Sequence, residues 1–319
     1  MSEGEVSVSR FRAIGLLLVL ATAVVSGVST FVNSYAVAGT NSDAFVTVRN
    51  VAVVALIAPA AFWVMRGSHL RLRGADWGRL ALIGLVGGAI PFLLFFQGVQ
   101  LATAAGGAAT ASFAYRTLFL MATVFGLVAL KERFHLRVVV AAALLLGGNL
   151  LLLSLVSPLW TNGMGYVLAA TVLWAVEYTI SKRTLRDLPS ATVALGRMGF
   201  GGAFLVGFLL VTAQVGSIAS LTGAQWGWVG ISAVLLAAFV GTWYAGLSRV
   251  DLGVATSVLV AGFPITWVLT IAARGTGFAL PAAIGALAVA LGVAVVIGRP
   301  LWQDFANLFR PSAADRSTT

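Results

Sequence analysis

Long runs of apolar residues, separated by short polar loops, recur along almost the whole chain. Each run is about as long as the roughly 20 residues that a helix needs to cross a bilayer. The runs are continuous and do not alternate apolar with polar residues as the strands of a membrane barrel would. We therefore predict an all-α integral membrane protein with ten transmembrane helices, at residues 12–37, 44–65, 77–99, 102–130, 136–156, 163–182, 190–213, 226–248, 253–273 and 280–298.

The composition agrees with this class. Sixty per cent of the 319 residues are hydrophobic and only 9% are charged, whereas an ordinary soluble domain carries about 25% charged residues. A net charge of +10 would suggest nucleic acid as a partner of a soluble protein. Here the basic residues follow the loops of a membrane protein, so we expect the lipid bilayer as a partner and no nucleic acid. Ala36-Val37-Ala38 resembles a signal-peptidase site, but the apolar run before it is too long for a signal peptide, so we predict that the first helix is retained.

Basic residues also predict the orientation. They lie in the N-terminal tail and in every second loop, at Arg10, Arg12, Arg66, Arg71, Arg73, Arg79, Lys131, Arg133, Arg137, Lys182, Arg183, Arg186, Arg249, Arg299, Arg310 and Arg316. The intervening loops at 38–43, 157–162 and 214–225 have none, and Arg274 is the exception. Because cytoplasmic loops of membrane proteins are enriched in lysine and arginine, we expect a multi-pass protein of the cell membrane with both termini in the cytoplasm.

The two halves of the chain resemble each other when one is shifted by 148 residues. The shift places Ser42 on Ser190, Arg49 on Arg197 and Gly98 on Gly246. Five helices per half is an odd number, so the second copy must enter the membrane in the opposite sense. We therefore predict two inverted five-helix repeats, at residues 12–156 and 163–298, followed by a cytoplasmic tail at 299–319. Inverted repeats can exchange conformations and so expose a central site to either side in turn.

Several residues of this repeat resemble the drug/metabolite transporter superfamily, and specifically its EamA-like ten-helix members. The similarity rests on an arginine early in the second helix of each half (Arg49 and Arg197), on Leu173-Trp174-Ala175, on Leu130-Lys131-Glu132 at the end of the fourth helix, and on Pro264 in the ninth. The resemblance covers residues 12–298. It implies transport of a small metabolite, often as export, and it does not specify which metabolite. The chain departs from the pattern where Arg116 aligns with Pro264, and where the second half has no acid that matches Glu132.

Arg116 is the first candidate site residue, because an ionisable side chain deep in a span usually faces a bundle interior or a water-filled path. Counted from residue 102 it lies about 14 residues along the fourth helix, or about 20 Å at 1.5 Å per residue. Its planar guanidinium suits the carboxylate or phosphate of an anionic or zwitterionic substrate. The alternative is that Arg116 is a structural counter-ion for Glu177, the acid that lies within a predicted span away from its ends.

Arg197 is predicted at a depth similar to that of Arg116 and Glu177. One carboxylate facing two arginines leaves positive charge for an anion, although Glu177 could instead take up a proton during transport. Arg49 is the repeat mate of Arg197 and has no matching acid, so we expect it to extend to the outer surface or to cap a helix, with substrate binding as the alternative. Aromatic side chains next to these charges are expected to line the path, namely Tyr115, Trp174 and Tyr178.

Other functional classes lack a signal in the sequence. The chain has no cysteine, and His69 and His135 have no neighbouring ligand, so we expect no metal site and no cofactor. No acid–base pair or nucleophile motif marks the spans, so we expect a transporter and no enzyme, with an intramembrane lipid-acting enzyme as the competitor from another class. The predicted function is export of an amino acid or a related small metabolite, and the alternative is a carrier of phosphorylated or nucleotide-linked sugars.

A stripe of small residues on the tenth helix, Ala282, Ala286, Ala290, Ala294 and Gly298, permits close helix contact. We expect it to pack against the fifth or ninth helix. A homodimer through this stripe is the alternative, but a monomer is sufficient for transport because both repeats lie in one chain.

Overall fold

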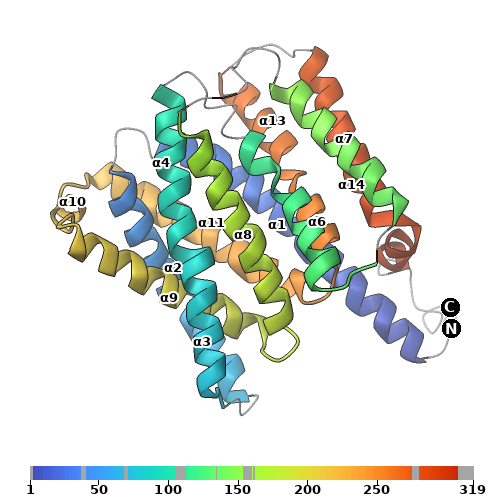
Figure 1. The fold of residues 1–319 in the computed structure, drawn as a ribbon, viewed down its shortest axis with the longest axis horizontal. Coiled ribbons are helices and arrows are strands. Elements are labelled where there is room, and N and C mark those ends of the chain that lie inside the picture. The colour runs from blue at the N-terminus through green and yellow to red at the C-terminus, as the bar shows by residue number, and fades with distance from the viewer. Residues whose placement is uncertain are drawn as a thin grey trace, which may run out of the picture.

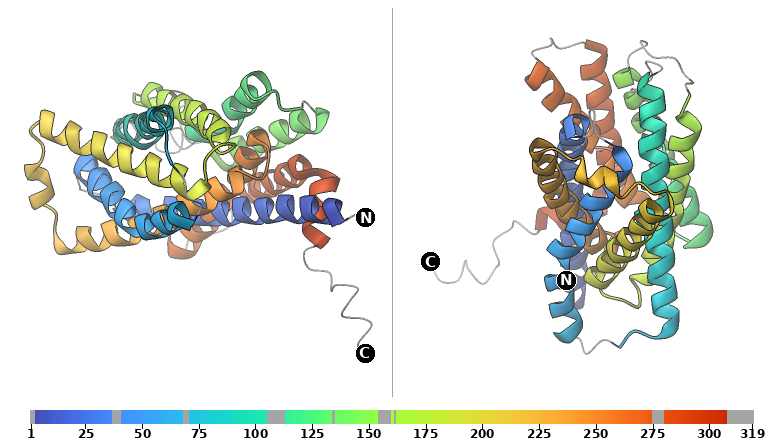
Figure 2. Two further views of the ribbon diagram at one scale, coloured as in Figure 1. Left: turned by 90° about the horizontal axis from the view of Figure 1, so that it is seen from below. Right: turned by 90° about the vertical axis from the view of Figure 1, so that its left-hand side faces the viewer.

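The computed structural model describes residues 3–36, 41–67, 71–104, 113–133, 135–153, 160, 162–274 and 280–307, and this part of the chain is almost entirely helical (Figures 1 and 2). The helices are α1 (Glu3–Ala36), α2 (Ser42–Gly67), α3 (Gly74–Ile83), the π-helical η1 (Gly84–Ala89), α4 (Ile90–Ala104), α6 (Leu118–Ala129), α7 (Leu136–Leu153), α8 (Met164–Thr184), α9 (Ser190–Val211), α10 (Gly216–Ala219), α11 (Gly223–Leu247), α12 (Leu252–Leu259), α13 (Gly262–Arg274) and α14 (Leu280–Asn307). Residues 113–116 are also helical and precede α6.

Eight helical segments of the described chain are long and apolar enough to cross a membrane. Two further apolar helices, Phe113–Ala129 and Leu136–Leu151, are shorter. The prediction of an all-helical, multi-pass membrane protein is therefore confirmed. The ten predicted segments fall on these eight long helices and two shorter ones, and parts of the fourth and fifth predicted spans lie outside the described residues.

Several predicted helix limits are wrong. The third span extends to Ala104 through α3, η1 and α4, so the fourth helix cannot begin at residue 102, and the depth of Arg116 counted from there does not hold. Residues 105–112 lie outside the described part of the chain. The ninth span divides into α12 and α13, and Pro264 is the third residue of α13. At that position its missing N–H falls at the break between the two helices and costs no interior hydrogen bond. The expected tail also begins as helix, because α14 continues past a kink at Gly298 to Asn307.

The π-helical turn η1 interrupts the third span where the sequence reads Gly84-Leu-Val-Gly-Gly-Ala89 and Pro91 follows. The turn bonds from residue i to residue i−5, as from Ile90 to Leu85, and Pro91, which has no N–H, cannot continue this pattern. The carbonyl of Gly87 in this turn accepts side-chain donors from other helices. Glycines at 84 and 88 also let the backbone of α9 approach closely, because a Cβ at either position would collide with the residues around Arg197 or Gly201. The turn thus brings a backbone acceptor against α9.

The helices of the two halves contact each other in matched pairs. Helix α1 packs against α11, and α4 packs against α8. Under the 148-residue shift these two contacts are counterparts, since the first helix of each half meets the third helix of the other. Three further contacts join equivalent helices directly, namely α2 with α9, α6 with α12, and α7 with α14. This is the arrangement expected of two copies related by a two-fold axis, and it places the centre of the bundle between the halves.

Helix α14 packs along α7, the fifth predicted helix, as Figure 1 shows. The residues at this contact coincide only in part with the predicted stripe. Gly285 and Gly292 lie close to Gly148 and to Leu145 on α7, whereas Ala290 is exposed. A spacing of four residues drifts around a helix of 3.6 residues per turn, so Ala290 leaves the contact face while Ala282 is buried and Gly298 lies against Arg137 of α7. The predicted partner helix is therefore confirmed, and the predicted residues are correct in part.

Candidate functional site

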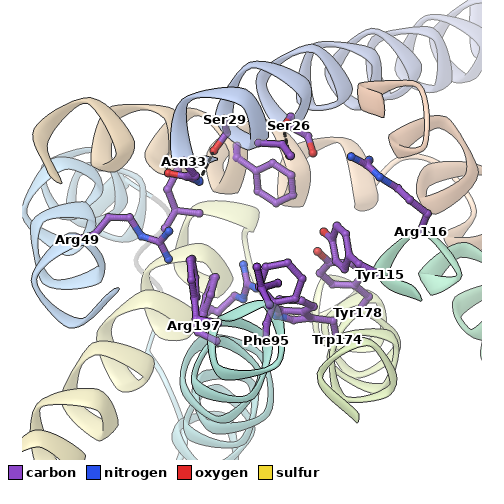
Figure 3. A pocket seen from close by; sticks show the side chains of 16 residues that line it. Ser26, Ser29, Asn33, Arg49, Phe95, Tyr115, Arg116, Trp174, Tyr178 and Arg197 are labelled. Atoms are coloured by element: carbon purple, nitrogen blue, oxygen red, sulfur yellow. Dashed lines mark hydrogen bonds between the residues drawn. The ribbon is translucent and has the colours of Figure 1, made fainter. Parts of the chain in front are cut away.

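A cavity of about 310 Å³ lies between the two halves of the bundle (Figure 3). Its walls are the second half of α1, the start of α2, α4, residues 115 and 116, and the middles of α8, α9 and α11. The lining residues are Ser26, Ser29, Thr30, Asn33, Arg49, Phe92, Phe95, Phe96, Val99, Tyr115, Arg116, Trp174, Tyr178, Arg197, Leu236 and Phe239. The first-half helices contribute the second half of α1, the start of α2 and residues 92–99 of α4. We call the end of the bundle with basic loops 66–79, 131–137 and 182–187 the basic end.

Glu177 lies just beyond the cavity wall and is fully buried. Its Oε2 lies 3.6 Å from Nε of Arg197. Its Oε1 accepts hydrogen bonds from the hydroxyls of Tyr244 at 2.6 Å and Ser181 at 2.5 Å. The carboxylate is thus held by a guanidinium and two hydroxyl groups, as a buried charge requires. Arg197, and not Arg116, is therefore the cation that pairs with Glu177 among the described residues.

The carbonyl of Gly87 completes this cluster. It accepts a hydrogen bond from Nη2 of Arg197 and another from the indole Nε1 of Trp174, each at 3.0 Å. A side chain at Gly87 would collide with Glu177. The π-helical turn therefore fixes the orientation of both Arg197 and Trp174 at the cavity wall. Sequence reasoning missed this role, although Pro91, four residues after Gly87, is a signal for an unpaired carbonyl in a helix.

Arg49 is buried, with 3% of its surface exposed, and it lines the cavity. The prediction that it extends to the outer surface or caps a helix is wrong. Its Nε and Nη2 donate to Oδ1 of Asn50, at 3.2 Å and 3.1 Å. Asn50 in turn donates to the carbonyl of Gly88 at 3.2 Å. The guanidinium lies over the ring of Phe92, 4.9 Å from its centroid. A neutral amide thus positions Arg49 where a carboxylate positions Arg197.

Arg116 is also buried, with 5% exposed. Its guanidinium lies over the rings of Phe263, at 4.9 Å, and Tyr115, at 5.8 Å. No acidic side chain of the described residues forms an ion pair with it, and its Nε has no hydrogen-bond partner there. The proposed role of Arg116 as counter-ion for Glu177 is therefore contradicted. Aromatic contact stabilises a cation, but this arrangement leaves the charge of Arg116 uncompensated.

The aromatic residues form a continuous wall between these arginines. Trp174 makes edge or tilted contacts with Phe92, Phe95 and Tyr115, with centroids 5.4 Å apart in each pair. Figure 3 shows Phe95, Trp174 and Tyr115 between Arg49 on one side and Arg116 on the other. Of the seven predicted site residues, six therefore line one cavity, and the seventh, Glu177, lies behind Arg197. Phe92 and Asn50 were not singled out from the sequence.

At the basic end of the bundle, two charged side chains bind the backbone around residues 247–253. The ammonium of Lys182 donates to the carbonyls of Leu247 and Val250, at 2.6 Å and 2.7 Å. The carboxylate of Glu132 accepts from the backbone N–H groups of Leu252, at 2.6 Å, and Gly253, at 3.2 Å, at the start of α12. A carboxylate is stabilised at this end of a helix by the helix dipole. Burial nevertheless raises the pKa of the Glu132 carboxyl above its ordinary value, and these hydrogen bonds offset the rise only in part.

The described residues hold no group of three or more histidine, cysteine, aspartate or glutamate side chains that could bind a metal ion. The polar atoms at the cavity are guanidinium, hydroxyl and amide groups. Such groups can bind the oxygens of an anion, and aromatic rings can cover an apolar body.

Comparison with known proteins supports the same architecture. A family model described as the EamA-like transporter family matches residues 13–154 and 161–298. No curated protein matches the chain. A solved crystal structure superposes with a TM-score of 0.72 at 20% sequence identity, over 89% of this chain and 97% of the other. At this identity the structural likeness shows the shared fold alone.

Proposed function

The chain belongs to the EamA-like transporter family, and from this premise we propose that it is a secondary transporter that exports an amino acid or a related small metabolite across the cell membrane. The single observation that carries the proposal is the cavity between the two halves, lined by three buried arginines and a wall of aromatic rings. Buried cations within membrane spans are costly, and they are typical of substrate or ion pathways.

The two matched halves support a mechanism of alternating access. We propose that they are inverted repeats and that the substrate site lies between them, as in other transporters built this way. The cavity lies away from the basic end, where Lys182 and Glu132 hold the backbone around residues 247–253. If the basic end is cytoplasmic, this conformation has its inner side closed. In the opposite conformation, the contacts of Lys182 and Glu132 would break, and the helices would close the other side of the cavity, at the end of α1 and the start of α2.

The contacts of Glu177 favour a structural role over proton transfer. Two hydroxyl donors and Arg197 all stabilise its ionised form. We propose that Glu177 remains charged and holds Arg197 against the cavity. The free arginines, Arg49 and Arg116, would then meet the substrate.

The size of the cavity bears on the alternative substrates. Small-molecule sites occupy about 300–1,000 Å³, and a cavity of about 310 Å³ is at the lower end. This favours a metabolite of amino-acid size over a nucleotide-linked sugar. The competing idea of an intramembrane enzyme has no support from the lining, because none of its described residues forms a nucleophile–base pair.

Counterflow in vesicles tests the transport function. The purified full-length chain is reconstituted into vesicles loaded with unlabelled amino acids, organic acids or sugar phosphates, one class at a time, and labelled compound is added outside. A transporter accumulates the label transiently without any energy source. Accumulation with at least one class, absent from protein-free vesicles, is the expected result. Hydrolysis or modification of the vesicle lipids in place of accumulation would contradict the proposal and indicate an enzyme.

A further inference from the structure

The charges at the cavity do not balance. Arg49, Arg116 and Arg197 all contribute to the lining, and none of its described residues is acidic. Glu177, behind the wall, compensates Arg197. Among the described residues Arg49 has only the neutral Asn50 as a hydrogen-bond partner, and Arg116 has only aromatic rings as neighbours of its charge. Two buried cations therefore have no anionic partner among the described residues. Since an unpaired charge within a membrane span is costly, a bound anion would stabilise them.

Arginine N–H groups without hydrogen-bond acceptors also indicate an anionic ligand. Nε of Arg116 and Nη1 of Arg197 are buried without a hydrogen-bond acceptor in the described residues. Buried donors of this kind usually have a partner, and an unpaired one calls for an explanation such as a ligand. Acceptor groups on a bound anion would supply these partners. The site is thus short of negative charge and of acceptors at the same time.

A zwitterion would not correct this deficit. The ammonium of a free amino acid needs acceptors, and the polar side chains of α1 at the cavity are neutral hydroxyl and amide groups, several of which already have hydrogen-bond partners within the protein. Asn33 donates to Ser29 at 3.2 Å and accepts from Ser232 at 2.7 Å, and Thr30 donates to the carbonyl of Ser26 at 2.8 Å. An ammonium here would meet no carboxylate and would lie near two guanidinium groups. The electrostatics favour a substrate with net negative charge.

The two uncompensated arginines lie on opposite sides of the cavity. In Figure 3 Arg49 and Arg116 lie on opposite sides of the group formed by Phe95, Tyr115 and Trp174. Each guanidinium also covers rings of its own, Phe92 for Arg49 and Phe263 for Arg116. One carboxylate could bind one of these cations but not both. An apolar space between two cations matches a molecule with an acidic group at each end.

We propose that the substrate is an organic dianion with a flat, apolar body, with one carboxylate bound by Arg49 and the other by Arg116 while the body lies against Phe95 and Trp174. This inference rests on the proposed transport function and, among small metabolites, favours an organic diacid over a free amino acid. Each arginine can hold a carboxylate through two parallel N–H···O bonds. The aromatic wall favours a flat, apolar substrate body. The distance between the two arginines determines which spacing of the two carboxylates fits.

Three probes that share one ring test the proposal on the purified full-length chain. Para-phenylenediacetate has two carboxylates, para-tolylacetate replaces one by a methyl group, and para-(aminomethyl)phenylacetate replaces one by an ammonium. The dissociation constant of each is measured from its stabilisation of the protein against thermal unfolding. The dissociation constant of the dianion should be lower than that of either analogue by a factor of about ten or more, as expected for the loss of one charged hydrogen-bonded contact. Equal binding of all three, tightest binding of the zwitterion, or no binding of the dianion would overturn the proposal.

Variants then assign the two ends. Arg49→Gln and Arg116→Gln should each reduce the preference for the dianion over the monoanion to within about twofold, because each removes one carboxylate contact. Arg71→Gln, at an exposed arginine before α3, is the matched control and should keep the full preference. If a glutamine variant does not fold, Arg49→Lys and Arg116→Lys retain the charge but lose the two-pronged geometry, and should each reduce the preference in part. An undiminished preference in all four would contradict the assignment.

Failure of this proposal is distinguishable from failure of the transport function. Counterflow of the zwitterion but not of the dianion would retain the transporter and reject the dianion. Lipid modification without counterflow of any compound would reject both.

Discussion

Arg49 and Arg197 lie over the same ring, that of Phe92, with their guanidinium carbons 4.9 Å and 5.9 Å from its centroid. They are equivalent positions of the two halves, yet their partners differ. Glu177 pairs with Arg197. The equivalent of Glu177 in the first half is Ser29, an uncharged residue that lines the cavity. The other two side chains that hold Glu177, Ser181 and Tyr244, are matched in the first half by Asn33 and Phe96. The second half is therefore charge-balanced, and the first half presents a free cation to the cavity.

The pairing of Arg197 with Glu177 predicts a specific rescue. Arg197→Met leaves a buried carboxylate without its cation and should lower the free energy of unfolding by about 3–5 kcal/mol. Adding Glu177→Gln removes that charge and should restore most of the stability, measured by thermal unfolding in detergent. Arg116→Met is the matched control, since Arg116 has no ion pair with Glu177, and Glu177→Gln should not rescue it. Rescue of Arg116→Met and not of Arg197→Met would reassign the partner.

The close approach of η1 to α8 predicts a steric effect at Gly87. A methyl group there would collide with the side chain of Glu177, so Gly87→Ala should destabilise the protein by about 1–3 kcal/mol. Gly78→Ala is the control, because a methyl group at this exposed helical glycine meets nothing. It should stabilise the helix by about 0.5–1 kcal/mol. Thermal unfolding of both variants measures the difference, and equal effects would mean that Gly87 is not at a tight contact.

The raised pKa of Glu132 predicts a dependence on pH. A carboxyl whose pKa is higher in the folded protein than in the unfolded chain binds its proton more tightly when folded. Its contribution to stability is therefore complete below the ordinary pKa and is lost as the pH rises through the raised value. The side chain of Glu132→Gln does not ionise. As the pH rises through the raised pKa, the Tm of the parent should therefore fall relative to the Tm of the variant. A difference that is constant with pH would contradict the shift.

The distribution of basic loops predicts the orientation of the chain. Reporter fusions after Thr40, Trp160 and Ser220 should report the outer face, and fusions after Leu70, Arg133 and Arg186 should report the cytoplasm. Alkaline phosphatase and green fluorescent protein activities provide the two readouts. If positions 40 and 160 report opposite sides, an odd number of spans lies between them, so the first half has an even number of spans and the inverted repeat would be rejected.

The helical membrane fold could be predicted because apolar runs of spanning length leave few alternatives. The division of the ninth span could not, since the apolar pattern continues through Val260 and Ala261 and only the backbone changes there. The end of the third span was missed for a similar reason, because residues 100–104 are as compatible with one helix as with the next. Loop boundaries within apolar sequence have no compositional signal.

The members of the candidate site could be predicted better than their pairing. Buried arginines, a buried glutamate and neighbouring aromatic residues are rare enough in spans to be noticed. Depth along a helix does not say which way a side chain faces, so depth alone could not distinguish Arg116 from Arg197 as the partner of Glu177. The burial of Arg49 depends on Asn50, which follows it directly, and on the carbonyl of Gly88. Such contacts require the helix packing that the sequence pattern does not contain.

Site-directed labelling tests most directly whether the cavity is the path of the substrate, because the chain has no native cysteine. Ser29→Cys places one thiol on the cavity wall, and Ser220→Cys places one at an exposed position outside it. A bulky, membrane-impermeant thiol reagent is applied to vesicles before counterflow is measured. We predict that it abolishes transport by Ser29→Cys, that bound substrate slows this inactivation, and that labelled Ser220→Cys transports at the parental rate. Full transport by completely labelled Ser29→Cys would contradict the account.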